Sequence, residues 1–151
     1  MASTMRYINM ISRCSAMYRT DRLAGTELGA CHFPYILTLC RNPGITQESL
    51  AKMVYINKSN VTRALLYLEQ HGFVERKQSE SDRRVLLVYP TDKAISMLPE
   101  IKSILKDWNE YITADISEEE FNVFISVLEK IAQKSAAYGS LSDTAGEGER
   151  L

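Results

Sequence analysis

Residues 46–84 read TQESLAKMVYINKSNVTRALLYLEQHGFVERKQSESDRR, and this stretch decides the fold. Thr46 and Asn57 each precede a run of residues with helical spacing, and both residue types accept hydrogen bonds from the free amides that open a helix. Gly72 is typical of the position that ends a helix. The stretch therefore predicts two short helices joined by a tight turn. These helices are expected over residues 47–54 and 57–70.

The pattern changes after Gly72 from helical spacing to short β-prone runs. Residues 73–78 and 84–89 contain the aromatic and branched side chains that favour strands. The polar residues 79–83 between them suit a protruding turn, and Pro90 ends the second run. We therefore expect a β-hairpin directly after the two helices.

Further helices are predicted on both sides of this stretch. The helix over residues 4–24 is apolar along two adjacent stripes, which favours two packing partners, such as its own core and a second subunit. Ser117 and Glu120 match the capping box that opens a helix. The tail over residues 138–151 is expected to be disordered, because it is rich in Gly, Ser and Glu. The other flanking helices are expected over residues 33–41, 91 to about 114, and 118–137.

The composition is that of one ordinary domain of 151 residues. No stretch approaches the roughly 20 apolar residues that span a bilayer, so we expect a cytoplasmic protein without a membrane partner. The three cysteines, Cys14, Cys31 and Cys40, lack the spacing of a disulfide framework or a zinc site. Neither the adjacent pair Cys31 and His32 nor any other motif predicts a metal or a cofactor.

The charge is distributed unevenly although the net charge is only −1. Residues 50–89 carry seven Lys and Arg against four Asp and Glu, whereas residues 90–151 carry six against twelve. The local basic excess permits a nucleic-acid partner for the first of these segments. By itself, such an excess is equally typical of a solvated surface.

The second helix of the pair has the chemistry of a helix that reads DNA. Asn pairs with adenine and Arg with guanine in the major groove, and the capped helix starts, including Thr46, offer amides to phosphate. The outward residues of its first turns are Lys58, Ser59, Asn60, Thr62 and Arg63. The hairpin adds Lys77, Arg83 and Arg84 as candidate phosphate or minor-groove contacts. The order of helix, turn, helix and basic hairpin predicts a mainly α, winged helix-turn-helix fold.

These residues resemble the MarR family of bacterial transcription regulators along nearly the whole chain to about residue 137. The resemblance is carried by Ile45–Ala51, Asn57–Arg63, Leu68–Arg76 and Asp82–Arg84. It implies a homodimer held by helices within residues 1–30 and 112–137, with residues 31–111 as the DNA-binding lobe on each half of a pseudo-palindromic operator. It also implies that Arg84 reaches the minor groove and that Asp82 braces it by an ion pair. Tyr55 departs from the family pattern, in which many relatives have glycine.

The resemblance further implies a repressor that a small aromatic or phenolic effector releases from DNA. The candidate residues of such an effector pocket are Tyr18, Arg22, His32, Tyr35, Trp108 and Tyr111. Packing in the dimer core is an equally good account of these aromatic side chains. Another branch of the family senses hydroperoxides with a first-helix cysteine, and Cys14 shares a helical face with Tyr18. For Cys14 the alternative is an ordinary apolar side chain.

Two other classes of function compete with the DNA-binding regulator. A winged-helix module that binds another protein is compatible with the acidic second half of the chain. An enzyme is not expected, because the sequence has no Gly-rich phosphate loop and no nucleophile motif.

Overall fold

The computed structural model describes residues 3–147, with side chains described as far as Tyr138. It divides into two units, residues 1–108 and 109–151, and each unit is described here by itself. None of the described helices has the length and apolar composition needed to cross a membrane.

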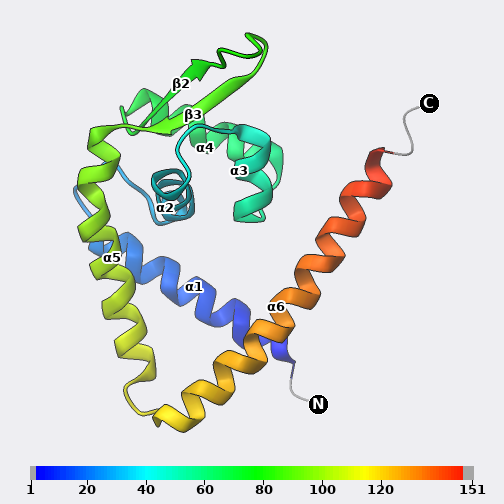
Figure 1. The fold of residues 1–151 in the computed structure, drawn as a ribbon. Helices are drawn as coiled ribbons and strands as arrows, with labels where there is room; N and C mark the ends of the chain where they lie inside the picture. The colour runs from blue at the N-terminus through cyan, green and yellow to red at the C-terminus, as the bar shows by residue number, and fades with distance from the viewer. Residues whose placement is uncertain (1–2, 148–151) are drawn as a thin grey trace. The chain divides into compact units, whose positions relative to one another are not determined.

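Helices and one small sheet make up the chain (Figure 1). In chain order the elements are α1 (Thr4–Arg22), the 3-10 turn η1 (Ala30–His32), α2 (Phe33–Arg41), β1 (Ile45–Thr46), α3 (Gln47–Val54), α4 (Lys58–Gln70), β2 (Val74–Gln78), β3 (Leu86–Pro90), α5 (Asp92–Thr113) and α6 (Glu118–Glu147). This confirms a mainly α fold with a β-hairpin wing after a helix-turn-helix pair.

The predicted caps set the starts of α3 and α4. Thr46 Oγ1 accepts the Ser49 amide at 3.1 Å at the start of α3, and Asn57 Oδ1 accepts the Asn60 amide at 2.9 Å at the start of α4. Gly72 follows α4 with φ +75°, a conformation that is easily reached without a Cβ. Local hydrogen bonding therefore fixes where these helices begin and end.

The core of the first unit lies between α2, α3, α4, α5 and the inner face of the sheet. Its largest fully buried side chains are Phe33, Phe73, Ile36, Leu39, Leu50, Leu65, Leu68, Ile101, Ile104, Val61 and Val88. Helical spacing places Val61, Leu65 and Leu68 on one face of α4, so burying that face leaves the opposite one for solvent or a partner.

The sheet has a third strand that the sequence did not reveal. Its order is β1-β3-β2, all antiparallel, and Ile45 pairs with Val88. A strand of two residues is too short to show the alternation by which strands are recognised. β3 also begins at Leu86 and not at the predicted Arg84, because the Asp82 carboxylate and carbonyl accept the amides of Arg84 and Val85 and extend the turn.

The turn between α3 and α4 uses a left-handed residue. Tyr55 has φ +54° and ψ +39°, and its amide donates to the Lys52 carbonyl at 3.4 Å. Tyr55 is the only non-glycine residue with positive φ in the described chain. The helix-turn-helix geometry is therefore kept without the glycine that the conformation favours.

The second unit contains the end of α5 and the whole of α6. The predicted capping box is present, with Ser117 and Glu120 exchanging hydrogen bonds of 3.0 and 3.3 Å. α6 runs to Glu147, which corrects the expected helix end near residue 137. A helix extends more easily than it starts, so residues that would not nucleate a helix can still prolong one. Residues 148–151 of the expected tail lie outside the described part of the chain.

Candidate nucleic-acid interface

The outward face of α4 presents five exposed polar or basic side chains at its capped end. They are Lys58, Ser59, Asn60, Thr62 and Arg63. The opposite face is held by Val61 and Leu65, both fully buried. The first two turns of α4 therefore show a dense set of hydrogen-bond donors and acceptors on a rigid support.

Several of these side chains are organised by one another and by α3. Arg63 Nη2 donates to Asn60 Oδ1, and Gln47 Nε2 donates to Thr62 Oγ1. The Thr62 hydroxyl also donates to the Lys58 carbonyl at 2.8 Å. The contact from Gln47 joins α3 to α4, while the other two lie within α4 and order its outward side chains.

The hairpin between β2 and β3 carries an arginine fixed by its neighbour. Asp82 Oδ1 accepts from the Arg84 amide at 3.0 Å and from Arg84 Nε at 3.2 Å. These hydrogen bonds from Arg84 lower the pKa of the Asp82 carboxyl. The Arg84 side chain is still 91% exposed, so the ion pair orients a guanidinium that remains open to a partner.

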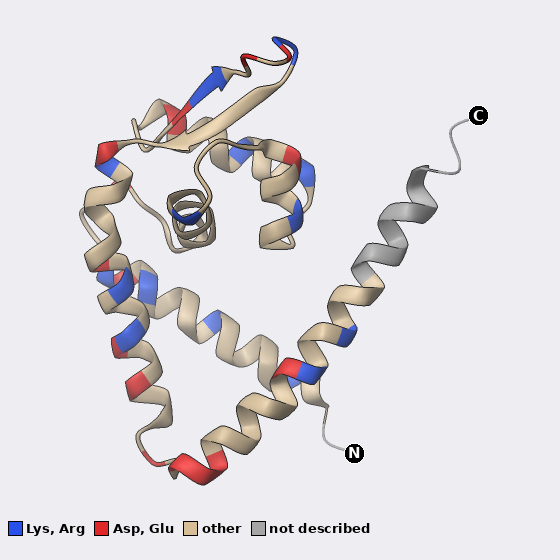
Figure 2. Cartoon of the chain, in the orientation of Figure 1, with Lys and Arg blue, Asp and Glu red and all other residues tan. Residues whose placement is uncertain are grey.

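Of the other two basic residues of the wing, Lys77 is paired with a carboxylate, whereas Arg83 is exposed at the tip. Lys77 Nζ lies 2.6 Å from a Glu75 carboxylate oxygen, and this hydrogen bond raises the pKa of Lys77. It also lies 5.2 Å from the centre of the Tyr89 ring. Figure 2 shows the Lys and Arg segments of β2 and the hairpin tip in blue.

An ion pair that the sequence analysis did not predict joins the wing to α4. Arg76 Nη2 on β2 lies 2.6 Å from Glu69 Oε2, and only 21% of the arginine side chain is exposed. The two residues are seven apart and belong to different elements, so no helical or strand period relates them. Their pairing fixes the base of the wing against the end of α4.

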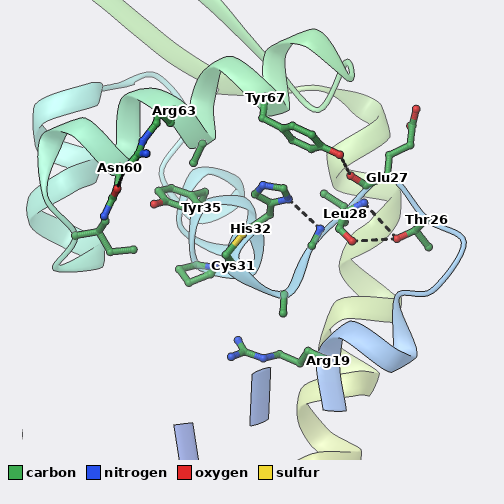
Figure 3. A pocket seen from close by; sticks show the side chains of 15 residues that line it. Arg19, Thr26, Glu27, Leu28, Cys31, His32, Tyr35, Asn60, Arg63 and Tyr67 are labelled. Atoms are coloured by element: carbon green, nitrogen blue, oxygen red, sulfur yellow. Dashed lines mark hydrogen bonds between the residues drawn. The ribbon is translucent and has the colours of Figure 1, made fainter. Parts of the chain in front are cut away.

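A pocket of about 890 Å³ lies beside α4 (Figure 3). Its walls come from the end of α1, the segment before α2, α2 and α4. The side chains with polar or aromatic chemistry include Arg19, Cys31, His32, Tyr35, Asn60, Arg63 and Tyr67. Asn60 and Arg63 thus belong both to the outward end of α4 and to the pocket.

The six residues suggested for an effector pocket are not all placed together. His32 and Tyr35 line the pocket. Tyr18, Arg22 and Trp108 form a separate cluster, with the Tyr18 and Trp108 ring centres 5.3 Å apart and the Arg22 guanidinium 5.8 Å from the Tyr18 ring. Tyr111 belongs to the second unit. The sequence analysis missed Arg19 and Tyr67 as lining residues, because no sequence period relates α1 to α4.

The cysteines lie in different surroundings. Cys14 and Cys31 are exposed, whereas burial raises the pKa of the half-buried Cys40. Cys14 lies in a second hollow on α1 with Arg6 and Arg13. Among the side chains that the structure describes, no group of three or more His, Cys, Asp or Glu is arranged to hold a metal ion.

Comparisons with known proteins agree with this geometry. Residues 32–86 match the model of the MarR family. The uncharacterized HTH-type transcriptional regulator YybA of Bacillus subtilis (strain 168) is 24% identical over 131 residues, which are 87% of each chain. The HTH-type transcriptional regulator BilQ of Clostridium symbiosum (strain WAL-14163) is 26% identical, over 76% of this chain and 78% of the relative.

Solved structures share the fold over nearly the full length. The transcriptional regulator SlyA superimposes with a TM-score of 0.89 at 23% identity, covering 93% of this chain and 99% of that one. A putative MarR family transcriptional regulator from Listeria monocytogenes, solved with a 26mer DNA, has a TM-score of 0.86 at 25% identity, with coverage of 95% and 96%.

Proposed function

We propose that this chain, whose residues 32–86 match the MarR family model, is a transcription regulator of that family that binds double-stranded DNA as a homodimer. The observation that carries the proposal is the capped, exposed polar end of α4 beside a wing with an oriented arginine, Arg84. The chain acts by binding, and no reaction is assigned to it.

In this proposal α4 enters the major groove with its first two turns. Asn60 and Arg63 have the side chains that pair with adenine and guanine edges, while Lys58 and Thr62 are placed for polar contacts nearby. Arg84 and Arg83 at the wing contact phosphates or the minor groove, which adds affinity without reading bases directly. Lys77 is a weaker candidate, because it already pairs with Glu75.

The terminal helices support the homodimer. α1 has no buried residue, yet it exposes the large apolar side chains Met5, Tyr7, Met10, Ile11 and Met17. α6, taken by itself, exposes Phe121, Val123, Phe124, Val127 and Ile131. Apolar stripes on two helices are typical of surfaces that a partner covers, and a second copy would supply both. A two-fold dimer presents two α4 helices to two half-sites of a pseudo-palindrome.

The pocket beside α4 supports control of a repressor by a small aromatic or phenolic anion. Arg19 and Arg63 supply positive charge, and Tyr35, Tyr67 and His32 supply aromatic walls. An anion held there would engage Asn60 and Arg63, the side chains proposed to read DNA. Effector and operator would therefore compete for the same two residues.

Binding to a duplex selected from a random-sequence library tests the DNA-reading role. Arg63→Ala is expected to weaken the selected site about 10- to 100-fold and random DNA less, since one base contact contributes about 1–3 kcal/mol. Lys102→Ala on α5 removes a positive charge away from α4 and controls for net charge. An equal loss of affinity on both DNAs would refute base reading by Arg63.

Sedimentation equilibrium tests the dimer. Ile11→Asp puts a charge into the apolar stripe of α1 and is expected to give a monomer that binds the operator weakly. Met53→Asp on α3 is the matched control, because Met53 is similarly exposed but lies outside the terminal helices. A dimer that survives Ile11→Asp as well as Met53→Asp would exclude this stripe from the interface.

A further inference from the structure

His32 occupies an unusual position in the wall of the pocket. It is the only polar or charged side chain that is buried among the described residues, with 8% exposure. Its Nδ1 accepts the amide hydrogen of Gly29 at 3.0 Å and closes the turn that leads into α2 (Figure 3). A ring nitrogen that accepts a hydrogen bond carries no proton, so His32 is neutral here, with its hydrogen on Nε2.

His32 begins a stack of three rings that passes through Tyr67 of α4 and ends at His71, directly after that helix. The His32 and Tyr67 ring centres are 4.7 Å apart at an interplanar angle of 21°, and Tyr67 stacks on His71 at 3.9 Å. The Tyr67 hydroxyl donates to the Glu27 carbonyl at 2.9 Å. The stack thereby joins the segment between α1 and α2 to the helix that carries Asn60 and Arg63.

The charges around this stack disfavour a second proton on His32. Glu27 is the only carboxylate among the residues that line the pocket, and it pairs with Lys93 of α5. Burial, and to a lesser extent His71, lower the pKa of His32. The other charged or titratable groups facing the pocket are Arg19 of α1, Cys31 of η1, Tyr35 of α2, and Arg63 and Tyr67 of α4.

We propose that protonation of His32 breaks its contact with Gly29 and weakens DNA binding as the pH falls from about 6.5 to about 5. The proton comes from solvent and binds Nδ1, so that the Gly29 N–H then faces another N–H. The turn before α2 then opens, and Tyr67 of α4 loses the His32 ring against which it stacks. This inference rests on the proposed DNA-binding function, which it extends with a pH response.

His71 provides an internal control for this inference. The chain has only two histidines, and these are the side chains whose ordinary pKa falls in this pH range. His71 Nδ1 lies 2.8 Å from the Tyr67 carbonyl oxygen. Because a carbonyl only accepts hydrogen bonds, this nitrogen carries the proton and donates it. The ring contact of His71 is therefore a donor contact, whereas the contact of His32 needs a free lone pair on Nδ1.

The test compares the wild type with His32→Asn and His71→Asn across the same pH range. Asn at position 32 carries an acceptor oxygen near the place of Nδ1 and does not titrate. The NMR signal of the Gly29 amide is expected to lose its hydrogen-bonded shift on acidification in the wild type and in His71→Asn only. Affinity for the selected duplex should fall about fivefold in those two proteins, the factor of one net hydrogen bond, and stay level in His32→Asn.

Two outcomes overturn the proposal. One is a Gly29 amide signal in the wild type that keeps its shift down to about pH 5 while the His32 ring titrates. The other is an affinity that falls equally in His32→Asn. A protein that binds no DNA at any pH refutes the proposed function and the regulatory role together. In that case the Gly29 amide signal still shows whether the hydrogen bond between Gly29 and His32 breaks on protonation. Because the amide readout uses the wild type, it stands even where a variant does not fold.

Discussion

Arg76 on β2 and Glu69 in the last turn of α4 form an ion pair in which the arginine Nη2 and Nε lie 2.6 and 3.1 Å from one carboxylate oxygen. This contact joins the base of the wing to α4. The two surfaces proposed to touch DNA are therefore held in a fixed relation by residues that need not touch DNA themselves.

Breaking this pair is expected to lower the free energy of unfolding. Glu69→Gln should cost about 1 kcal/mol, because the pair is only partly exposed and its hydrogen bonds are charged. Glu75→Gln is the matched control, since it breaks the more exposed pair with Lys77 and should cost less than Glu69→Gln does. Urea denaturation measures both variants, and equal losses would show that the Arg76 pair contributes no more than a surface pair.

Replacing Tyr55 by glycine is expected to stabilise the fold. A left-handed conformation costs a residue with a side chain about 1 kcal/mol relative to glycine, and the Tyr55 side chain is 76% exposed, so little packing is lost. The Tm of Tyr55→Gly should rise. Tyr55→Ala keeps the Cβ and the strain, and it should leave the Tm close to that of the wild type. A lower Tm for the glycine variant would contradict the strain argument.

Alanine substitutions at Gly44 and Gly72 distinguish the cost of backbone strain from that of a steric clash. Gly44 and Gly72 have φ of +80° and +75°, but a Cβ on Gly44 would lie 2.9 Å from the Tyr89 hydroxyl oxygen, whereas one on Gly72 would meet nothing within 4 Å. Gly72→Ala is expected to cost about 1 kcal/mol from strain alone. Gly44→Ala should cost about 1–3 kcal/mol more, as in overpacking. Equal costs in chemical denaturation would mean that the Tyr89 ring moves aside freely.

The Asp82 and Arg84 pair should make the wing insensitive to pH near neutrality. Because Arg84 lowers the pKa of Asp82, the pair is complete above the ordinary Asp range and is lost only as the pH falls through the lowered value. Asp82→Asn is expected to bind the selected duplex several-fold more weakly than Glu80→Gln does, measured by fluorescence anisotropy. Both variants remove one negative charge from the wing, so equal affinities would exclude a bracing role for Asp82.

Much of the DNA-binding half could be predicted because its information is local. Thr46, Asn57 and Gly72 act through hydrogen bonds and backbone angles within a few residues, and the burial of Val61, Leu65 and Leu68 follows from helical period. The predicted end of α6 was wrong, because Gly and Ser disfavour the start of a helix but interfere much less with its extension. The start of β3 was missed because the Asp82 side chain competes for backbone amides.

By itself, the sequence determined the order of the helices and the hairpin and the outward face of α4, since these depend on period and capping. Only the tertiary structure decided that β1 pairs with β3, that Arg76 reaches Glu69, and that Arg19, His32 and Tyr67 surround one pocket with Asn60 and Arg63. These contacts join residues from different elements, and no local rule fixes which side chains meet once the core has been packed. The pH response proposed for His32 needs both kinds of information, because its hydrogen bond to Gly29 is local whereas its stack on Tyr67 of α4 is tertiary.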